Sequence, residues 1–121
     1  MHFKHASSSP NESWTADLQM WAISQLASVW LIDLEPYEPC KVAGIPVRWR
    51  IDPARQRIEV VLFDGTASIL ARWSPIRRPS PMEAEDGGRG LVLEGVLTID
   101  DEGSVVMLNP SFHRAQFSIF A

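Results

Sequence analysis

The sequence predicts a single, mainly β domain in which five strands follow one N-terminal helix. Helical periodicity is confined to about residues 10–31, alternation of apolar and polar residues begins near Cys40, and turn residues separate the alternating runs. A chain of 121 residues suits one domain with its own core. We expect a flexible leader over residues 1–9, a helix over 10–31 and a β-barrel over 36–121.

The expected helix begins with a capping box. Ser9-Pro10-Asn11-Glu12 places proline at the first helical position, where its missing N–H costs nothing. Trp14, Leu18 and Trp21 then fall on one wide apolar stripe, which must be buried against something. The stripe can pack on its own domain, or part of it can dock a protein partner or a second copy of the chain.

The strand region follows Pro36 and Pro39, which cannot continue a helix. The expected strands span residues 40–51, 57–63, 67–73, 91–99 and 104–109. Residues 110–120 extend or follow the fifth strand, with a bend forced by Pro110.

The first strand is long and its alternation changes phase. Cys40 and Val42 share one face of the strand. After Gly44 the apolar set becomes Ile45, Val47, Trp49 and Ile51. A slip of one residue at a glycine is typical of a β-bulge, so we expect a bulge at Gly44.

The second and third strands alternate cleanly around the turn Asp64-Gly65-Thr66. The residues expected to face the core are Ile58, Val60, Leu62, Ile69, Ala71 and Trp73. We interpret the turn itself as structural, because it only has to reverse the chain between two strands.

Five strands, a long bulged first strand and a non-strand connection over residues 74–90 indicate a small Greek-key barrel of the OB type. The connection holds three prolines and three glycines, which exclude a long helix or strand. A five-stranded SH3-like barrel is the alternative, but it gives no reason for so long a connection.

Charge is unevenly distributed along the chain. The net charge is −4, which disfavours a general polyanion binder. Residues 41–78, however, carry eight basic and three acidic side chains, a net +5, and the rest of the chain carries −9. An anion would therefore bind the central segment.

OB folds that bind single strands need cations for phosphates and aromatic rings for bases, on the outer sheet face and its flanking loops. The candidate residues for binding single-stranded DNA or RNA are Arg48, Arg50, Arg57, Phe63, Arg72, Arg77 and Arg78. Alternatively, long arginine stems simply cover a half-buried sheet face. Trp49 and Trp73 fall on the inward side and are expected in the core.

Enzymatic motifs are missing from the sequence, so we expect no catalytic residues and no cofactor. Its three histidines lack metal-ligand spacing, and no nucleophile elbow, phosphate loop or dinucleotide turn occurs. The acidic turn at 100–102 is interpreted as a solvated hairpin tip rather than a cation site. One cysteine, Cys40, and no apolar run of membrane-spanning length favour a cytoplasmic protein without membrane contact.

Several segments resemble a known family. VAGIPVRWRI, IEVVLFDGTASILARW, IRR and GRGLVLEGVLTIDDEGSVVMLNPSF together resemble small actinobacterial OB-fold proteins of the nucleic-acid-binding type, over about residues 30–117. That family carries a D-G-T-G-x-L turn, an R-R pair and a Y-N-P motif; here Ala67 replaces the second glycine, and Leu108-Asn109-Pro110 matches the last motif. A more distant likeness is to the wedge domain of RecG-type helicases and to anticodon-binding domains of some aminoacyl-tRNA synthetases. The resemblance implies an OB barrel and nucleic-acid binding.

Overall fold

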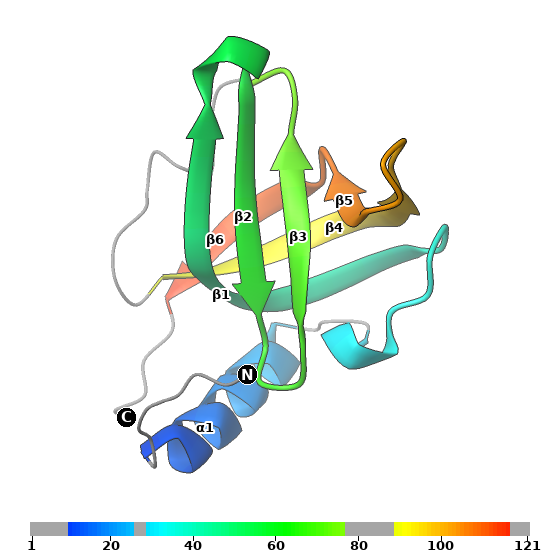
Figure 1. Cartoon of the computed structure of the whole chain (residues 1–121). Coiled ribbons are helices and arrows are strands. Elements are labelled where there is room, and N and C mark those ends of the chain that lie inside the picture. Colours follow the sequence, from blue (N-terminus) through cyan, green and yellow to red (C-terminus); the bar gives the residue numbers. More distant parts are fainter. Residues whose placement is uncertain (1–9, 26–28, 77–88, 117–121) are drawn as a thin grey trace.

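The computed structural model describes residues 10–25, 29–76 and 89–116. The predicted leader at 1–9 lies outside them. Within the described part, one α-helix precedes six strands that curve around one another (Figure 1). The elements are α1 (Pro10–Ser24), η1 (Leu31–Asp33, a 3-10 turn), β1 (Pro39–Asp52), η2 (Pro53–Arg55, a 3-10 turn), β2 (Arg57–Phe63), β3 (Ser68–Trp73), β4 (Arg89–Ile99), β5 (Val105–Leu108) and β6 (Ser111–Gln116).

The strands form one sheet in the order β1-β2-β3-β5-β4-β6, and an additional pairing of β1 with β4 closes five of them into a ring. β3 and β5 run parallel, whereas the other pairs are antiparallel. The sheet is therefore a near-barrel of the OB type, which confirms the predicted fold class.

β6 adds a sixth strand to the five that we predicted. Pro110 does bend the chain after β5, but Ser111–Gln116 then pair with Arg89–Glu94 of β4. Gly95 gives the bend room, because a Cβ at this position would lie 3.2 Å from the Cβ of Pro110. Proline thus ends one strand and redirects the chain to a different part of the same neighbour.

β1 pairs with two different strands along its length. Its first part, Pro39–Gly44, pairs with β4, and the part from Ile45 pairs with β2. Gly44 lies at the change of partner, where a Cβ would come within 2.6 Å of the Phe63 carbonyl oxygen. Only glycine allows the two backbones to approach this closely.

The bulge that we expected at Gly44 lies three residues later. Pro46 pairs with Leu62 and Arg48 with Val61, so Val47 is the extra residue. Val47 is 48% exposed, although the alternation of the strand had grouped it with the inward Trp49. Ile45 pairs with Phe63 and so shares the outer face with it, also against prediction. Trp49 and Ile51 keep the predicted parity, although Ile51 is exposed at the end of the strand.

The side chains of β2 and β3 that we predicted to face inward do form the core of the barrel. Ile58, Val60, Leu62, Ala71 and Trp73 are buried there, and Ile69 packs against them. The main core residues supplied by the other strands and η1 are Leu31, Val42, Leu91, Leu93, Leu97 and Met107. The period-two prediction for β2 and β3 is therefore confirmed.

α1 packs on its own domain with one side. Leu18 and Ala22 are fully buried, and Ala22 belongs to a small cluster with Ala43 and Val92 of the underlying sheet. The ring of Trp21 lies against Gly90, where a Cβ would overlap it. This observation favours the first of the two interpretations of the helix.

The helix is shorter than the 10–31 that we expected. Ser24 Oγ donates a hydrogen bond to the Trp21 carbonyl, 2.6 Å away, and such side chains compete with the helical backbone bonds. Leu31–Asp33 forms a separate 3-10 turn, because the Leu31 N–H is held by a side chain of the barrel.

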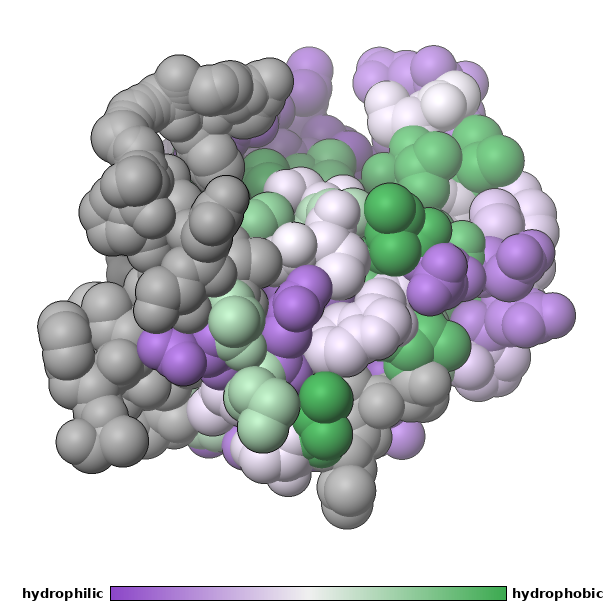
Figure 2. All heavy atoms as spheres, turned by 90° about the horizontal axis from the view of Figure 1, so that it is seen from below, coloured by the Kyte–Doolittle hydropathy of each residue, from purple (hydrophilic) through white to green (hydrophobic). Residues whose placement is uncertain are grey.

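The lower side of the molecule, seen in Figure 2, shows apolar side chains scattered among polar ones. Met20 and Ile23 of α1 contribute to the exposed apolar surface with 68% and 57% exposure. Among the residues described, no helix combines the length and apolarity that crossing a membrane requires.

Candidate nucleic-acid interface

The bulge at Val47 determines which side chains of β1 share a face with those of β2 and β3. Directly paired residues point to the same side of a sheet. One row across the outer face is therefore Arg48, Val61 and Leu70, and the next is Arg50, Glu59 and Arg72. The face predicted for nucleic acid is thus brought together from three strands.

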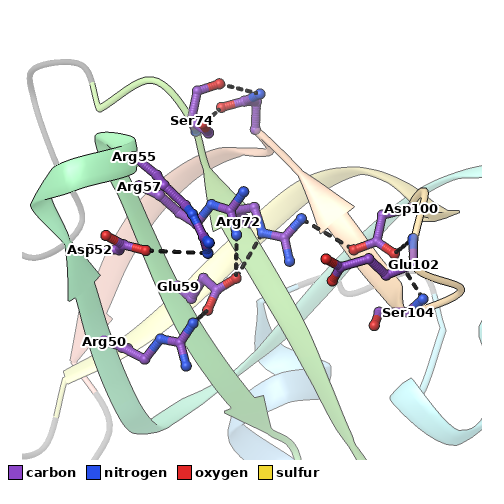
Figure 3. A network of polar contacts seen from close by, with 11 residues as sticks. Arg50, Asp52, Arg55, Arg57, Glu59, Arg72, Ser74, Asp100, Glu102 and Ser104 are labelled. Atoms are coloured by element: carbon purple, nitrogen blue, oxygen red, sulfur yellow. Dashed lines mark hydrogen bonds and ion pairs between the residues drawn. The ribbon is translucent and has the colours of Figure 1, made fainter.

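Glu59 is the centre of charge on this face (Figure 3). Its Oε2 accepts a hydrogen bond from Arg72 Nε at 2.7 Å and lies 3.9 Å from Arg57 Nη1, and its Oε1 lies 3.4 Å from Arg50 Nη2. Only 9% of the Glu59 side chain is exposed. A carboxylate this buried is stabilised by the cations around it, and in turn it neutralises part of their charge.

Arg72 connects this cluster to the turn between β4 and β5. Its Nη1 lies 3.4 Å from Asp100 Oδ2, and its side chain is only 12% exposed. Burial lowers the pKa of Arg72, but hydrogen bonds and attraction from Glu59 and Asp100 outweigh it and raise the pKa above the ordinary value. Arg72 therefore stabilises the fold through these two carboxylates and is not available to bind a phosphate.

The predicted binding residues divide into two groups by exposure. Arg48 and Arg50 are exposed, and Arg48 makes no ion pair within the described ranges. Arg57 and Arg72 are held by Glu59, with 25% and 12% of their side chains exposed. Phe63 is half-buried on the outer face. Arg77 and Arg78 lie outside the described residues.

A hollow of about 220 Å³ lies on the outer face. Val61 and Leu70 give it apolar walls, and Arg48 and Arg50 flank it on the β1 side. Trp49, Glu59 and Val60 complete the lining. The hollow therefore combines apolar surface, two exposed cations and one carboxylate.

Sequence reasoning missed Glu59 as the hub. The alternating pattern did place Glu59 outward, but two of its three arginine partners, Arg50 and Arg72, lie 9 residues earlier and 13 residues later in the chain. Only the register of β1 and β3 against β2 shows that these two arginines meet the same carboxylate.

The turn Asp64-Gly65-Thr66 is structural, as we interpreted it. Asp64 is buried, and its Oδ1 accepts hydrogen bonds from Thr66 N at 2.8 Å, Thr66 Oγ1 at 2.6 Å and Ala67 N at 3.3 Å. Its Oδ2 accepts one from Leu31 N at 2.9 Å. The carboxylate holds four hydrogen bonds within the chain and is only 1% exposed, so it is not accessible to a ligand, and it anchors the segment before β1.

The Leu108-Asn109-Pro110 motif is structural too. Asn109 Oδ1 accepts from Ser74 N at 2.9 Å, and its Nδ2 donates to Ser74 O at 3.2 Å. Trp73 Nε1 donates to the Pro110 carbonyl at 2.9 Å. The motif fastens the end of β3 to the junction of β5 and β6.

The acidic turn between β4 and β5 is ordered by its first carboxylate. Asp100 Oδ1 accepts from Ser104 N at 2.8 Å and from Glu102 N at 2.9 Å. The Ser104 bond is the main cause that lowers the pKa of Asp100; burial opposes it, and Glu102 N–H and Arg72 add to it. Asp101 and Glu102 are exposed, so this side of the face repels phosphate. Within the described ranges, no group of three metal-ligating side chains gathers.

Solved structures resemble this fold, although no family model and no curated protein matches the chain. One is RecG bound to a three-way DNA junction, with 18% identity, a TM-score of 0.58, and 70% of this chain covered against 12% of that chain. Asparaginyl-tRNA synthetase from Pyrococcus horikoshii matches with 15% identity, a TM-score of 0.58, and coverage of 74% and 23%. An OBody, AM3L09, bound to hen egg-white lysozyme matches with 17% identity, a TM-score of 0.55, and coverage of 76% and 97%.

These likenesses show the fold alone. The chain spans 12% of the RecG chain and 23% of the synthetase, so it corresponds to a small part of each. The predicted likeness to RecG and to an aminoacyl-tRNA synthetase is confirmed at the level of the fold. The likeness to small actinobacterial proteins stays a prediction.

Proposed function

We propose that this protein binds single-stranded nucleic acid on the outer face of β1, β2 and β3. The observation that carries the proposal is the hollow that Val61 and Leu70 line and the exposed Arg48 and Arg50 flank. Arginines of this kind bind phosphates, and an apolar hollow beside them accepts a base. We propose a binding role without catalysis, in the reducing cytoplasm that a single cysteine favours.

The number of exposed cations on the face determines how many phosphates can be contacted, and so how strongly the affinity depends on salt. Arg48 and Arg50 supply the phosphate contacts, and Arg55 on η2 is a third cation at the same end of the sheet, although it pairs with Asp52 at 3.6 Å. Two or three phosphate contacts with a single strand give a slope of about −1.4 to −2.1 when the logarithm of the association constant is plotted against the logarithm of the salt concentration. We expect weak binding that is visible at low salt.

Two of the matching structures support this proposal by analogy of fold. RecG is bound to DNA in its structure, and the synthetase acts on a tRNA, as its name says. Fold likeness does not transfer function by itself, so the residues of the outer face carry the proposal.

The test is fluorescence anisotropy of a labelled, unstructured oligonucleotide, titrated with protein at several salt concentrations. Replacing Arg48 and Arg50 by alanine is expected to weaken binding and reduce the magnitude of the salt slope by about 1.4. A control that removes two charges elsewhere, Lys41→Ala with Arg114→Ala, should leave the slope unchanged. Absence of binding by the unmodified protein at low salt would overturn the proposal.

A second candidate function is protein binding through α1. Met20 and Ile23 point away from the buried side of the helix and expose 68% and 57% of their surface. The OBody bound to lysozyme shows that an OB fold can bind a protein. A homodimer or a complex that uses this side should dissociate when both residues become glutamate, as measured by light scattering. A monomeric mass that does not change with protein concentration would rule out the homodimer.

A further inference from the structure

The proposed face contains a carboxylate where an anion is expected to bind. Glu59 lines the hollow together with Arg48 and Arg50, and its side chain is 9% exposed. A carboxylate beside phosphates is repulsive unless the ligand donates a hydrogen bond to it. The position of Glu59 therefore constrains which nucleic acid fits.

The two oxygens of Glu59 are engaged to different degrees. Oε2 accepts the 2.7 Å hydrogen bond from Arg72, a side chain that is itself tied to Asp100. Oε1 has a 3.4 Å contact with Arg50, whose side chain is 65% exposed. Each carboxylate oxygen has two acceptor sites, so Oε1 retains capacity for another donor.

Binding of phosphate increases the need for such a donor. When the exposed guanidinium of Arg50 turns to a phosphate, Oε1 loses its contact with that cation. A carboxylate oxygen that has lost a partner favours a ligand that can donate a hydrogen bond to it. A ligand that brings its own donor to this position should therefore bind better than one that does not.

The sugar adjoins the phosphate, so its hydroxyl is the donor nearest to Arg50 in a bound strand. Ribose carries a 2′-hydroxyl that can donate, and deoxyribose does not. We propose that the outer face prefers single-stranded RNA to DNA, because Oε1 of Glu59 accepts a hydrogen bond from a ribose 2′-hydroxyl beside the phosphate on Arg50. This inference rests on the proposed function and names its ligand.

The test compares three oligonucleotides of one unstructured sequence with the unmodified protein, by anisotropy at low salt. They are RNA, DNA and RNA with 2′-fluoro groups, which keep the sugar pucker of RNA but cannot donate. RNA is expected to bind about tenfold tighter than either of the others. Equal affinities for RNA and DNA overturn the inference and leave the proposed function standing. Binding of 2′-fluoro RNA as tight as that of RNA also overturns it.

A substitution at Glu59 tests whether this residue causes the preference for RNA over DNA. Glu59→Gln keeps the size of the side chain and removes its charge, so DNA should bind tighter and the ratio of RNA to DNA affinity should fall to about twofold. An unchanged ratio would overturn the role of Glu59. Lys41→Ala is the control and should keep the ratio, and thermal unfolding checks that both variants fold. If none of the three oligonucleotides binds the unmodified protein, the proposed function itself fails.

Discussion

The backbone N–H of Leu31 donates a hydrogen bond to the carboxylate of Asp64, which lies 33 residues later in the chain, at 2.9 Å. This bond fixes the segment after α1 to the turn between β2 and β3. Leu31 is thereby held in the barrel core, where it is 4% exposed.

Replacing Asp64 by alanine should destabilise the protein by about 2–4 kcal/mol, because it leaves one buried and three partly buried donors without their acceptor. Urea unfolding measures the change. Asp101→Asn, at an exposed site on the other turn, is the control and should stay within about 0.5 kcal/mol. A loss at Asp64 no larger than in the control would show that the turn does not anchor the segment.

Arg72 and Arg50 both contact Glu59, but their loss should have different effects. Arg72→Ala removes a shielded partner of two carboxylates and should cost about 2–3 kcal/mol of stability. Arg50→Ala removes an exposed partner and should cost less than about 1 kcal/mol. Urea unfolding gives the stabilities, and oligonucleotide anisotropy should show the larger loss of binding for Arg50. Equal stabilities for the two variants would contradict this division of roles.

Asp100 should make stability depend on pH in the acid range. Its pKa is lowered in the folded state, first by the hydrogen bond from Ser104 N–H, so its stabilising contribution is complete above the ordinary value of 3.8. That contribution is lost as the pH falls through the folded-state pKa. The difference in free energy of unfolding between the unmodified protein and Asp100→Asn should be constant near neutral pH and shrink on acidification. A difference that grows toward low pH would have the wrong sign.

Gly44→Ala should destabilise the barrel by about 1–3 kcal/mol, because the new methyl group would lie 2.6 Å from a carbonyl oxygen of β2. Gly103→Ala provides the contrast. That glycine has a φ of +84° and nothing within 4 Å of an added Cβ, so its cost of about 1 kcal/mol comes from backbone conformation alone. Thermal or urea unfolding compares the two, and an equal or smaller loss at Gly44 would argue against the close approach.

The alternation of β2 and β3 was sufficient to predict their core residues, because both strands are regular and one face is buried. The bulge of β1 was displaced from Gly44 to Val47, since its position depends on the register against Leu62 and Val61 rather than on local sequence. Glycine did mark a special position, but for a different reason, the close approach to Phe63. The pattern of apolar residues in one strand shows reliably that a β-bulge is present. It shows the position of the bulge less reliably.

The candidate face was only half predictable. Alternation placed Arg48, Arg50 and Arg72 on the outer side, as the pairing shows. Which of them is exposed depends on Glu59 and Asp100, which come from other strands and turns. The sequence contains these carboxylates but not their distances, so the number of available cations could not be read from it.

The parallel pairing of β3 with β5 has a consequence for how the molecule opens. Only Ala71 with Met107 and Arg72 with Leu108 pair there, so the backbone alone makes a short seam. Side chains fasten the same seam at both ends, through Arg72 to Asp100 and through Asn109 to Ser74. Local opening of the barrel should therefore begin at this seam. Substitutions at Asn109 should accelerate amide hydrogen exchange along β3 and β5 before they lower the global stability.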